Sequence, residues 1–381
     1  MTAHQTTRAK KIFRPLLYRR AWFGLLAVPA FVLAQLAHAF PAAVEHTYSR
    51  AVYPVLSRAL GRLTGALPFS VSEILIYIAV TGGIAYLVYE IRGIAVKQKQ
   101  RRRVAARLIS TLLCIGGLWY FLFIVMCGLN YYRQPLSEYE HIGLEVREST
   151  VDELAALCAE LADTVNGLRE MLPEDENGVM ATGFASYYEG AAFAGSVFGN
   201  IGRDYPIFGG FVPKPKPVFS SLAMSHMNIV GVFVPFTYEA NVNVHIPDYA
   251  VPSAMMHELA HFKGFMREDE ANFISWMACR GSGSDEFHYS GAMLAFAHCT
   301  NALYSADRGL YVEVMAGLSE KVRRDLAHNS AYWRRFDGPV SDASTAVNNT
   351  YLRANRQSDG VKSYGRMVDL LLAEFRGTAN A

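Results

Sequence analysis

Cysteine is scarce in this sequence, with five residues in 381. Three of them, Cys158, Cys279 and Cys299, lie in the C-terminal two thirds of the chain, where an odd number cannot be completely paired. A Cys279–Cys299 bridge and buried free thiols are the two alternatives for the last two. No pair has zinc-finger spacing, so the cysteines define neither a disulfide framework nor a metal site.

Other features are also missing. The formal net charge is only +2, which gives no reason to expect nucleic acid or another polyanion as a partner. The sequence has no G-x-S-x-G, no phosphate-binding glycine loop and no internal repeat. Serine-hydrolase, P-loop and repeat architectures therefore lack support.

Long apolar runs are present, and three lie in the first third of the chain. They predict transmembrane helices over about 21–40, 71–91 and 109–129, because each approaches the roughly 20 residues that cross a bilayer. The alternatives are buried helices of a soluble core and, for the first run, a signal peptide cleaved near Ala37-His-Ala39. Three clustered runs favour an anchored membrane region over 21–129.

The basic residues predict the orientation of these helices. Residues 1–20 and the link between the second and third runs are rich in Lys and Arg, whereas the link between the first and second has three Arg. By the positive-inside rule, residues 1–20 and the second link are cytoplasmic. We therefore expect a multi-pass protein of the cytoplasmic (inner) membrane with an extracytoplasmic domain over 130–381.

The most specific motif is His257-Glu-Leu-Ala-His261. Histidines one helical turn apart project from the same face, so both imidazoles can bind one metal ion. Glu258 is then placed to accept a proton from a water molecule at the metal. The alternative is a helix with two structural histidines.

The flanking residues favour the metal site. Pro252 suits the first turn of a helix and Gly264 suits its end, so the chain is predicted to turn there. A second helix starting near 267 would direct Glu268 at the metal as third ligand. Asn272, one turn further, would hydrogen-bond a ligand histidine, and Glu270 would point away.

The segment Glu268-Asp-Glu-Ala-Asn272 resembles the E-x-x-A-[DN] element that supplies the third ligand in gluzincin-type metallopeptidases. The surrounding sequence resembles a domain-of-unknown-function family of bacterial membrane proteins grouped with the zincins. That similarity includes 130–133, 231–236, 239–243, 257–272 and 360–365. It implies a zincin-like domain that binds Zn²⁺. The family has no established substrate.

The fold class that follows is a mainly α membrane protein, with three N-terminal transmembrane helices before a mostly helical, zincin-like α+β domain with a small sheet. Thr150-Val-Asp-Glu153 is a capping box, and 229–236 is a predicted strand; this strand or 241–245 could pair with substrate. Helices are also expected over about 150–171, 185–200, 285–304, 312–336, 342–354 and 361–376.

These features predict a membrane-anchored zinc metallopeptidase that hydrolyses peptide bonds of a peptide or protein substrate. His257, His261 and Glu268 would bind Zn²⁺, and Glu258 would be the general base. Tyr289 is the predicted oxyanion donor, with His245, His288 and Tyr364 as alternatives. Glu239 and Asn241 could contact substrate or stabilise a turn. The alternative function is a zincin-fold sensor or scaffold without turnover; nothing indicates the oligomeric state.

Overall fold

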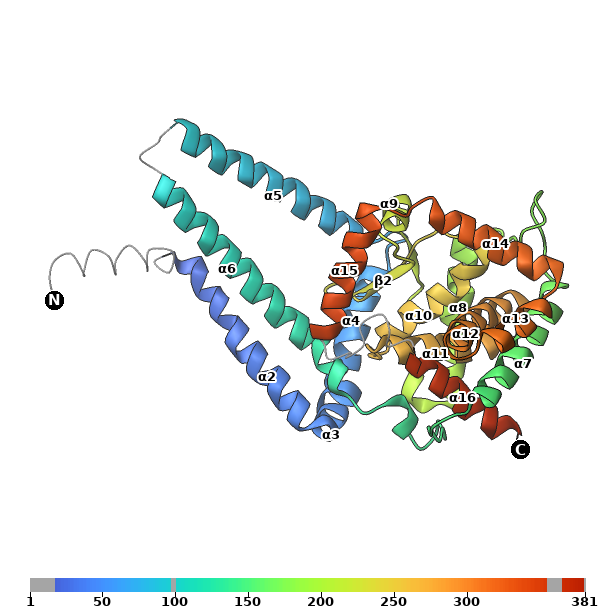
Figure 1. Cartoon of the computed structure of the whole chain (residues 1–381). Coiled ribbons are helices and arrows are strands. Elements are labelled where there is room, and N and C mark those ends of the chain that lie inside the picture. The colour runs from blue at the N-terminus through green and yellow to red at the C-terminus, as the bar shows by residue number, and fades with distance from the viewer. Residues whose placement is uncertain (1–17, 97–100, 355–364, 380–381) are drawn as a thin grey trace.

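The computed structural model describes residues 18–96, 101–354 and 365–379. Figure 1 shows two parts: long helices that project to one side, and a mostly helical body that contains the rest of the described chain. This arrangement matches the predicted mainly α architecture with a small sheet.

Three helical segments are long and apolar enough to cross a membrane, as predicted. They are Arg19–Ala39, Val71–Gly93 and Arg101–Met126. The first consists of η2 (Arg19–Leu26) and α2 (Ala27–Ala39), and the other two belong to α5 (Val71–Val96) and α6 (Arg101–Met126). Most of their side chains face outward and are apolar, which suits lipid rather than water.

The third helix differs from the predicted 109–129 at both ends. It begins at Arg101, because the arginine-rich segment continues the same helix instead of forming a link. It ends at Met126, so Cys127 lies after the span and not within it. All five cysteines are free thiols, and Cys279 and Cys299 are therefore not bridged.

The first and third membrane helices pack closely. A Cβ on Gly117 of α6 would collide with the backbone of Gly24 in η2. Small residues at such a contact let two helix backbones approach, which is the usual way in which membrane helices associate.

The segment between the first two membrane helices belongs to the body, which the predicted membrane region 21–129 did not anticipate. It forms α3 (Pro41–Ala43), the π-helix η3 (Val44–Val52) and α4 (Tyr53–Gly65). The Tyr53 hydroxyl donates to the carbonyl oxygens of His261 and Phe262, at 3.1 and 3.2 Å. A hydropathy profile does not reveal contacts between residues so far apart in the sequence.

The α-helices that the body adds after the third membrane helix are α7 (Val151–Arg169), α8 (Tyr187–Asp204), α9 (Ser221–His226), α10 (Val251–Phe262), α11 (Glu268–Arg280), α12 (Asp285–Ala306), α13 (Arg308–Ala316), α14 (Glu320–Arg334), α15 (Pro339–Ala354) and α16 (Gly365–Ala379). The core of the body is built around α12, which contacts α7, α10, α11 and α16. The predicted capping box of α7 is confirmed, with Glu153 N donating to Thr150 Oγ1 at 3.1 Å.

The predicted helix over 312–336 is in fact two helices, α13 and α14. The chain turns between them, where Ser319 caps α14 by accepting a hydrogen bond from Val322 N at 3.3 Å. Serine is a strong N-cap residue, so the start of a new helix at this point is predictable from the local sequence. The predicted helix over 361–376 is α16 from Gly365 onward, and residues 361–364 lie outside the described part.

The small sheet has the order β1-β3-β2. β1 (Lys216–Pro217) is parallel to the central β3 (Glu239–Val242), and β2 (Gly231–Val234) is antiparallel to it, with Val232 opposite Asn241. The predicted strand over 229–236 is thus confirmed as β2, and it lies at one edge. Both β2 and β3 contact α10, the helix that carries the histidine motif.

Candidate metal centre

Helix α10 presents both histidines of the motif on one face. Pro252 occupies the first turn, where its missing N–H leaves no hydrogen bond unmade. The rings of His257 and His261 lie with centroids 4.6 Å apart and nearly perpendicular, at 89°. The one-turn spacing therefore brings the imidazoles together, as predicted.

Helix α10 ends at Phe262, and the chain turns at Gly264, whose φ of +87° is a left-handed conformation that suits glycine. A Cβ there would also lie 2.8 Å from Nδ2 of Asn130. α11 then begins at Glu268, so the predicted turn between two helices is confirmed.

The turn brings Glu268 to the two imidazoles. Its Oε2 lies 3.2 Å from Nε2 of His257, and its Oε1 lies 3.6 Å from Nε2 of His261. One ligand atom from each of the three residues lies within 4.8 Å of the other two. The three predicted metal ligands are thus brought into a single cluster.

The far nitrogens of both imidazoles are held by acceptors. Nδ1 of His257 lies 2.7 Å from Oδ1 of Asn272, and Nδ1 of His261 lies 2.7 Å from the Phe265 carbonyl oxygen. A carbonyl oxygen can only accept, so each Nδ1 carries the proton and each Nε2 is left to bind a cation. The hydrogen bond predicted between Asn272 and a histidine of the motif is therefore present.

The neighbouring carboxylates point elsewhere. Oε1 of Glu270 accepts from the backbone N–H of Leu136 and from Arg267, both at 2.7 Å. Burial, followed by the nearby Glu270, raises the pKa of Asp269 to about 6. The prediction that Glu270 faces away from the histidines is confirmed.

Glu258 lies beside this cluster and is almost fully buried. Burial raises its pKa to about 7, against the opposing effect of His257 and His261. Its Oε2 has no hydrogen-bond partner among the described residues. A carboxyl group with a pKa near neutrality and a free oxygen is suited to accept and return a proton.

The charges within the cluster depend on one another. Burial disfavours ionisation of Glu268, but His261 and His257 outweigh it and hold the pKa of Glu268 well below its usual range. Burial also lowers the pKa of His261, yet Glu268 raises it overall to about 9. Without a metal, Glu268 is therefore ionised and is stabilised by the proton on His261. A divalent cation could replace this proton as the positive charge next to Glu268.

The edge strand β2 contacts Glu258. A Cβ on Gly231 would collide with the Glu258 carboxylate, so only glycine fits there. The backbone N–H of Phe233 also hydrogen-bonds Glu258 and partly counteracts the rise of its pKa. Gly231 is a residue that sequence reasoning placed in the strand without seeing its contact with the site.

Tyr289 is not at the cluster, which corrects the predicted oxyanion donor. Its side chain is fully buried, and its hydroxyl donates to Oδ2 of Asp325 at 2.7 Å. Asp325 also pairs with the buried Arg169 at 2.6 Å, so Tyr289 is part of a closed structural network. Position along α12 could not reveal this, because the partners come from α7 and α14.

The other tyrosine and histidine alternatives are no better placed. Nδ1 of His245 lies 2.8 Å from the Tyr332 hydroxyl, and His288 packs against Trp276. Tyr364 lies outside the described residues.

Glu239 and Asn241 have structural roles. Glu239 is buried and accepts from the backbone N–H groups of Val71 and Ser72, while Lys216 pairs with it at 2.5 Å. Asn241 is buried within β3, and its Nδ2 donates to the Val232 carbonyl oxygen at 3.3 Å. Of the two alternatives, the structure favours the structural one.

Tyr187 is a residue that the sequence did not single out. Its buried hydroxyl has no hydrogen-bond partner among the described residues. Burial, followed by Tyr188 and Glu258, raises its pKa well above the usual value. Tyr187 thus keeps its proton in the neighbourhood of Glu258, and an unpaired buried hydroxyl of this kind has the property expected of an oxyanion donor.

Comparison with known proteins gives a family but no function. No curated protein and no solved structure matches the chain. Residues 48–372 match the model of a family described as "Protein of unknown function (DUF3810)". The match spans most of the segment between the first two membrane helices, the second and third membrane helices and nearly all of the body, and the chain therefore belongs to the DUF3810 family.

Proposed function

We propose that this protein is a membrane-anchored zinc metallopeptidase of the zincin type that hydrolyses peptide bonds on the outer face of the cytoplasmic membrane. The observation that carries the proposal is the convergence of His257, His261 and Glu268 beside a buried carboxyl group, Glu258, with a pKa of about 7. Three ligands plus an adjacent base are the parts of a hydrolytic zinc site.

The residues present fit zinc. Two imidazole nitrogens and one carboxylate are a common catalytic ligand set, and they leave a position open for water or substrate. Both imidazoles have the tautomer that exposes Nε2, because Asn272 and the Phe265 carbonyl hold the other nitrogen. When bound, zinc would lower the pKa of a water molecule and polarise the substrate carbonyl.

Glu258 would move the proton. As the water oxygen attacks the peptide carbonyl carbon, the Glu258 carboxylate accepts the released proton. The same proton then passes to the amine nitrogen while the C–N bond breaks. Tyr187 replaces Tyr289 as the proposed donor to the developing oxyanion.

The edge strand β2 supplies a binding surface for an extended substrate. Its side away from β3 has no strand partner among the described residues, and Gly231 and Phe233 lie next to Glu258. A peptide added along this edge would pair with the backbone of β2 and pass beside the base. This arrangement favours a peptide or protein substrate over a small molecule.

Placement on the outer face rests on the distribution of basic residues. Lys and Arg are abundant before the first membrane helix and again at the end of the second and the start of the third, and both regions are therefore assigned to the cytoplasm. The body follows the third helix and would lie on the opposite side.

The test compares purified full-length protein with Glu258→Gln for zinc content and for cleavage of casein. We expect one zinc per chain in both, and a loss of turnover of about 10²- to 10⁴-fold in the variant, since Glu258 is a base and not a ligand. Glu286→Gln, which changes a carboxylate bonded to Thr182 and Gly183, is the matched control and should stay active.

Two outcomes would contradict parts of the proposal. Zinc binding without any Glu258-dependent cleavage would favour the alternative, a metal-binding sensor or scaffold. Absence of zinc from the wild-type protein would refute the metal site itself.

A further inference from the structure

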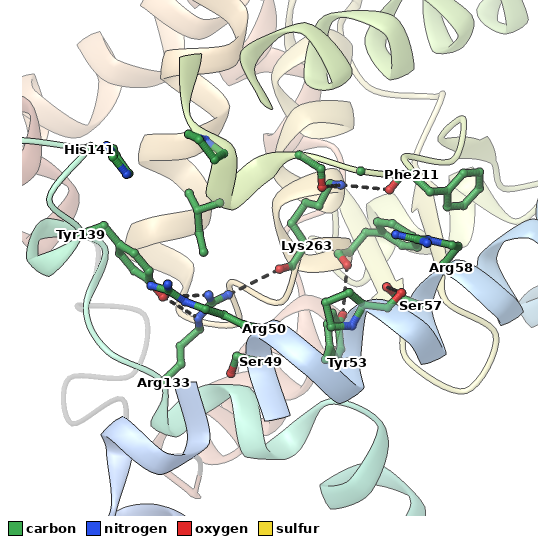
Figure 2. A pocket seen from close by; sticks show the side chains of 16 residues that line it. Ser49, Arg50, Tyr53, Ser57, Arg58, Arg133, Tyr139, His141, Phe211 and Lys263 are labelled. Atoms are coloured by element: carbon green, nitrogen blue, oxygen red, sulfur yellow. Dashed lines mark hydrogen bonds between the residues drawn. The ribbon is translucent and has the colours of Figure 1, made fainter. Parts of the chain in front are cut away.

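A cavity of about 530 Å³ has a lining that includes none of His257, His261 and Glu268. It is enclosed by η3 and α4 on one side and, on the other, by the chain around 206–211 and the end of α10. Figure 2 shows Lys263 between Arg58 on one side and Arg50 and Arg133 on the other. None of the described residues that line the cavity is Asp or Glu.

Two of the four cations are fixed in position. Nζ of Lys263 donates to the carbonyl oxygens of Gly209 and Phe211, at 2.8 and 2.9 Å. Arg133 is buried, and its guanidinium donates to Glu45 at 3.1 and 3.2 Å. Holding cations in place before a ligand arrives reduces the entropy lost on binding.

The cations outnumber the available carboxylates. Glu45, which does not line the cavity, pairs with both Arg50 and Arg133. Lys263 has only neutral carbonyl partners, and Arg58 has no hydrogen bond or ion pair with any residue that the structure describes. An excess of positive charge therefore remains inside a concave site, where it attracts an anion.

The cavity also lies close to the membrane helices in the chain. Arg50 follows α2 through the short α3, and Arg133 follows the end of α6 after the 3-10 turn η5 (Gly128–Tyr132). Both arginines are therefore only a short distance along the chain from the ends of membrane helices.

From these observations we infer that the cavity binds a phosphate group, either of an anionic lipid headgroup or of a soluble phosphate compound. Guanidinium groups match the geometry of phosphate oxygens and bind them in pairs, while lysine adds a point charge. The site is independent of the proposed metallopeptidase function, because none of the metal ligands lines it.

The first arm of the test measures binding of inorganic phosphate to the detergent-solubilised full chain by calorimetry. Arg58→Gln and Arg50→Gln should each weaken binding about tenfold, as expected for loss of one charged hydrogen bond. The matched control is Arg334→Gln, an exposed arginine of α14 outside the cavity, which should bind as the wild type does.

The second arm reconstitutes the same four proteins in phosphatidylglycerol or phosphatidylcholine nanodiscs and counts retained lipid by native mass spectrometry. Selective loss of phosphatidylglycerol from the Arg58 and Arg50 variants identifies a lipid phosphate. An effect in the first arm alone identifies a soluble phosphate. If both variants match Arg334→Gln in both arms, the inference is wrong. Zinc content, measured in parallel, should be the same in all four proteins.

Discussion

Glu268 is the residue on which the identity of the third ligand depends. Its two carboxylate oxygens face the two imidazoles, whereas Glu270 faces Leu136 and Arg267. Glu268→Ala should therefore abolish stoichiometric zinc, and Asn272→Ala should weaken zinc binding about 10- to 100-fold through His257. Metal analysis after dialysis against a competing chelator measures both.

The matched control is Glu270→Ala, which removes a buried carboxylate of the same helix. It should keep zinc but lower the melting temperature, because Leu136 N–H and Arg267 lose their acceptor. Zinc loss in this variant equal to that in Glu268→Ala would defeat the assignment.

Substitutions of Tyr187 and Tyr289 distinguish a hydroxyl proposed to act in catalysis from a hydroxyl that stabilises the fold. Tyr187→Phe should lower kcat by about 10²- to 10³-fold if its free hydroxyl stabilises the oxyanion. Tyr289→Phe should leave kcat unchanged and destabilise the fold by about 1–3 kcal/mol, because Asp325 loses a buried donor. Cleavage kinetics and chemical unfolding of both variants provide the comparison, and the reverse pattern would restore Tyr289.

At the scale of elements, the break between α10 and α11 aims Glu268 at the histidines. An alanine at Gly264 would be strained at its φ of +87° and would approach Asn130. We expect Gly264→Ala to lower the melting temperature and to weaken zinc binding, since the helices can no longer meet at the same angle. Thermal unfolding and metal analysis measure the two effects.

Gly143→Ala is the control for strain alone. Gly143 also has a positive φ, of +64°, but a Cβ there meets nothing within 4 Å. This variant should lose about 1–2 kcal/mol of stability and keep its zinc. Equal zinc affinity in both variants would show that the break does not position Glu268.

Most of the helices around the site were predictable because their signals are local. The capping box at Thr150 and the glycine at 264 act within a few residues of themselves, and both are where the sequence predicted them. The helix predicted over 312–336 was wrong in extent, because periodicity continues across the turn that Ser319 caps.

At the scale of the whole molecule, the three apolar helices and the body lie on opposite sides of Figure 1, and orientation decides where the body resides. A periplasmic-type reporter fused after Ala381 should be active only outside the cytoplasm, given the basic residues before the first helix and where the second helix ends and the third begins. Fusions within 97–100 should show the opposite behaviour. Cytoplasmic activity of the C-terminal fusion would place the proposed site inside the cell.

The sequence by itself determined the membrane helices and the cluster of His257, His261 and Glu268. Hydropathy needs no tertiary partner, and His257, His261, Glu268 and Asn272 are related by helical spacing and one glycine turn, all within 16 residues. Such relations are short in the chain, so local geometry suffices to predict them.

Only the tertiary structure decided which distant residues lie together. The unpaired Tyr187 hydroxyl, Gly231 against Glu258, and Arg50 and Arg58 in the cavity that Lys263 also lines belong to elements far apart in the sequence. Their contacts depend on how helices and strands pack in three dimensions, and that packing cannot be predicted from the spacing of residues along the chain.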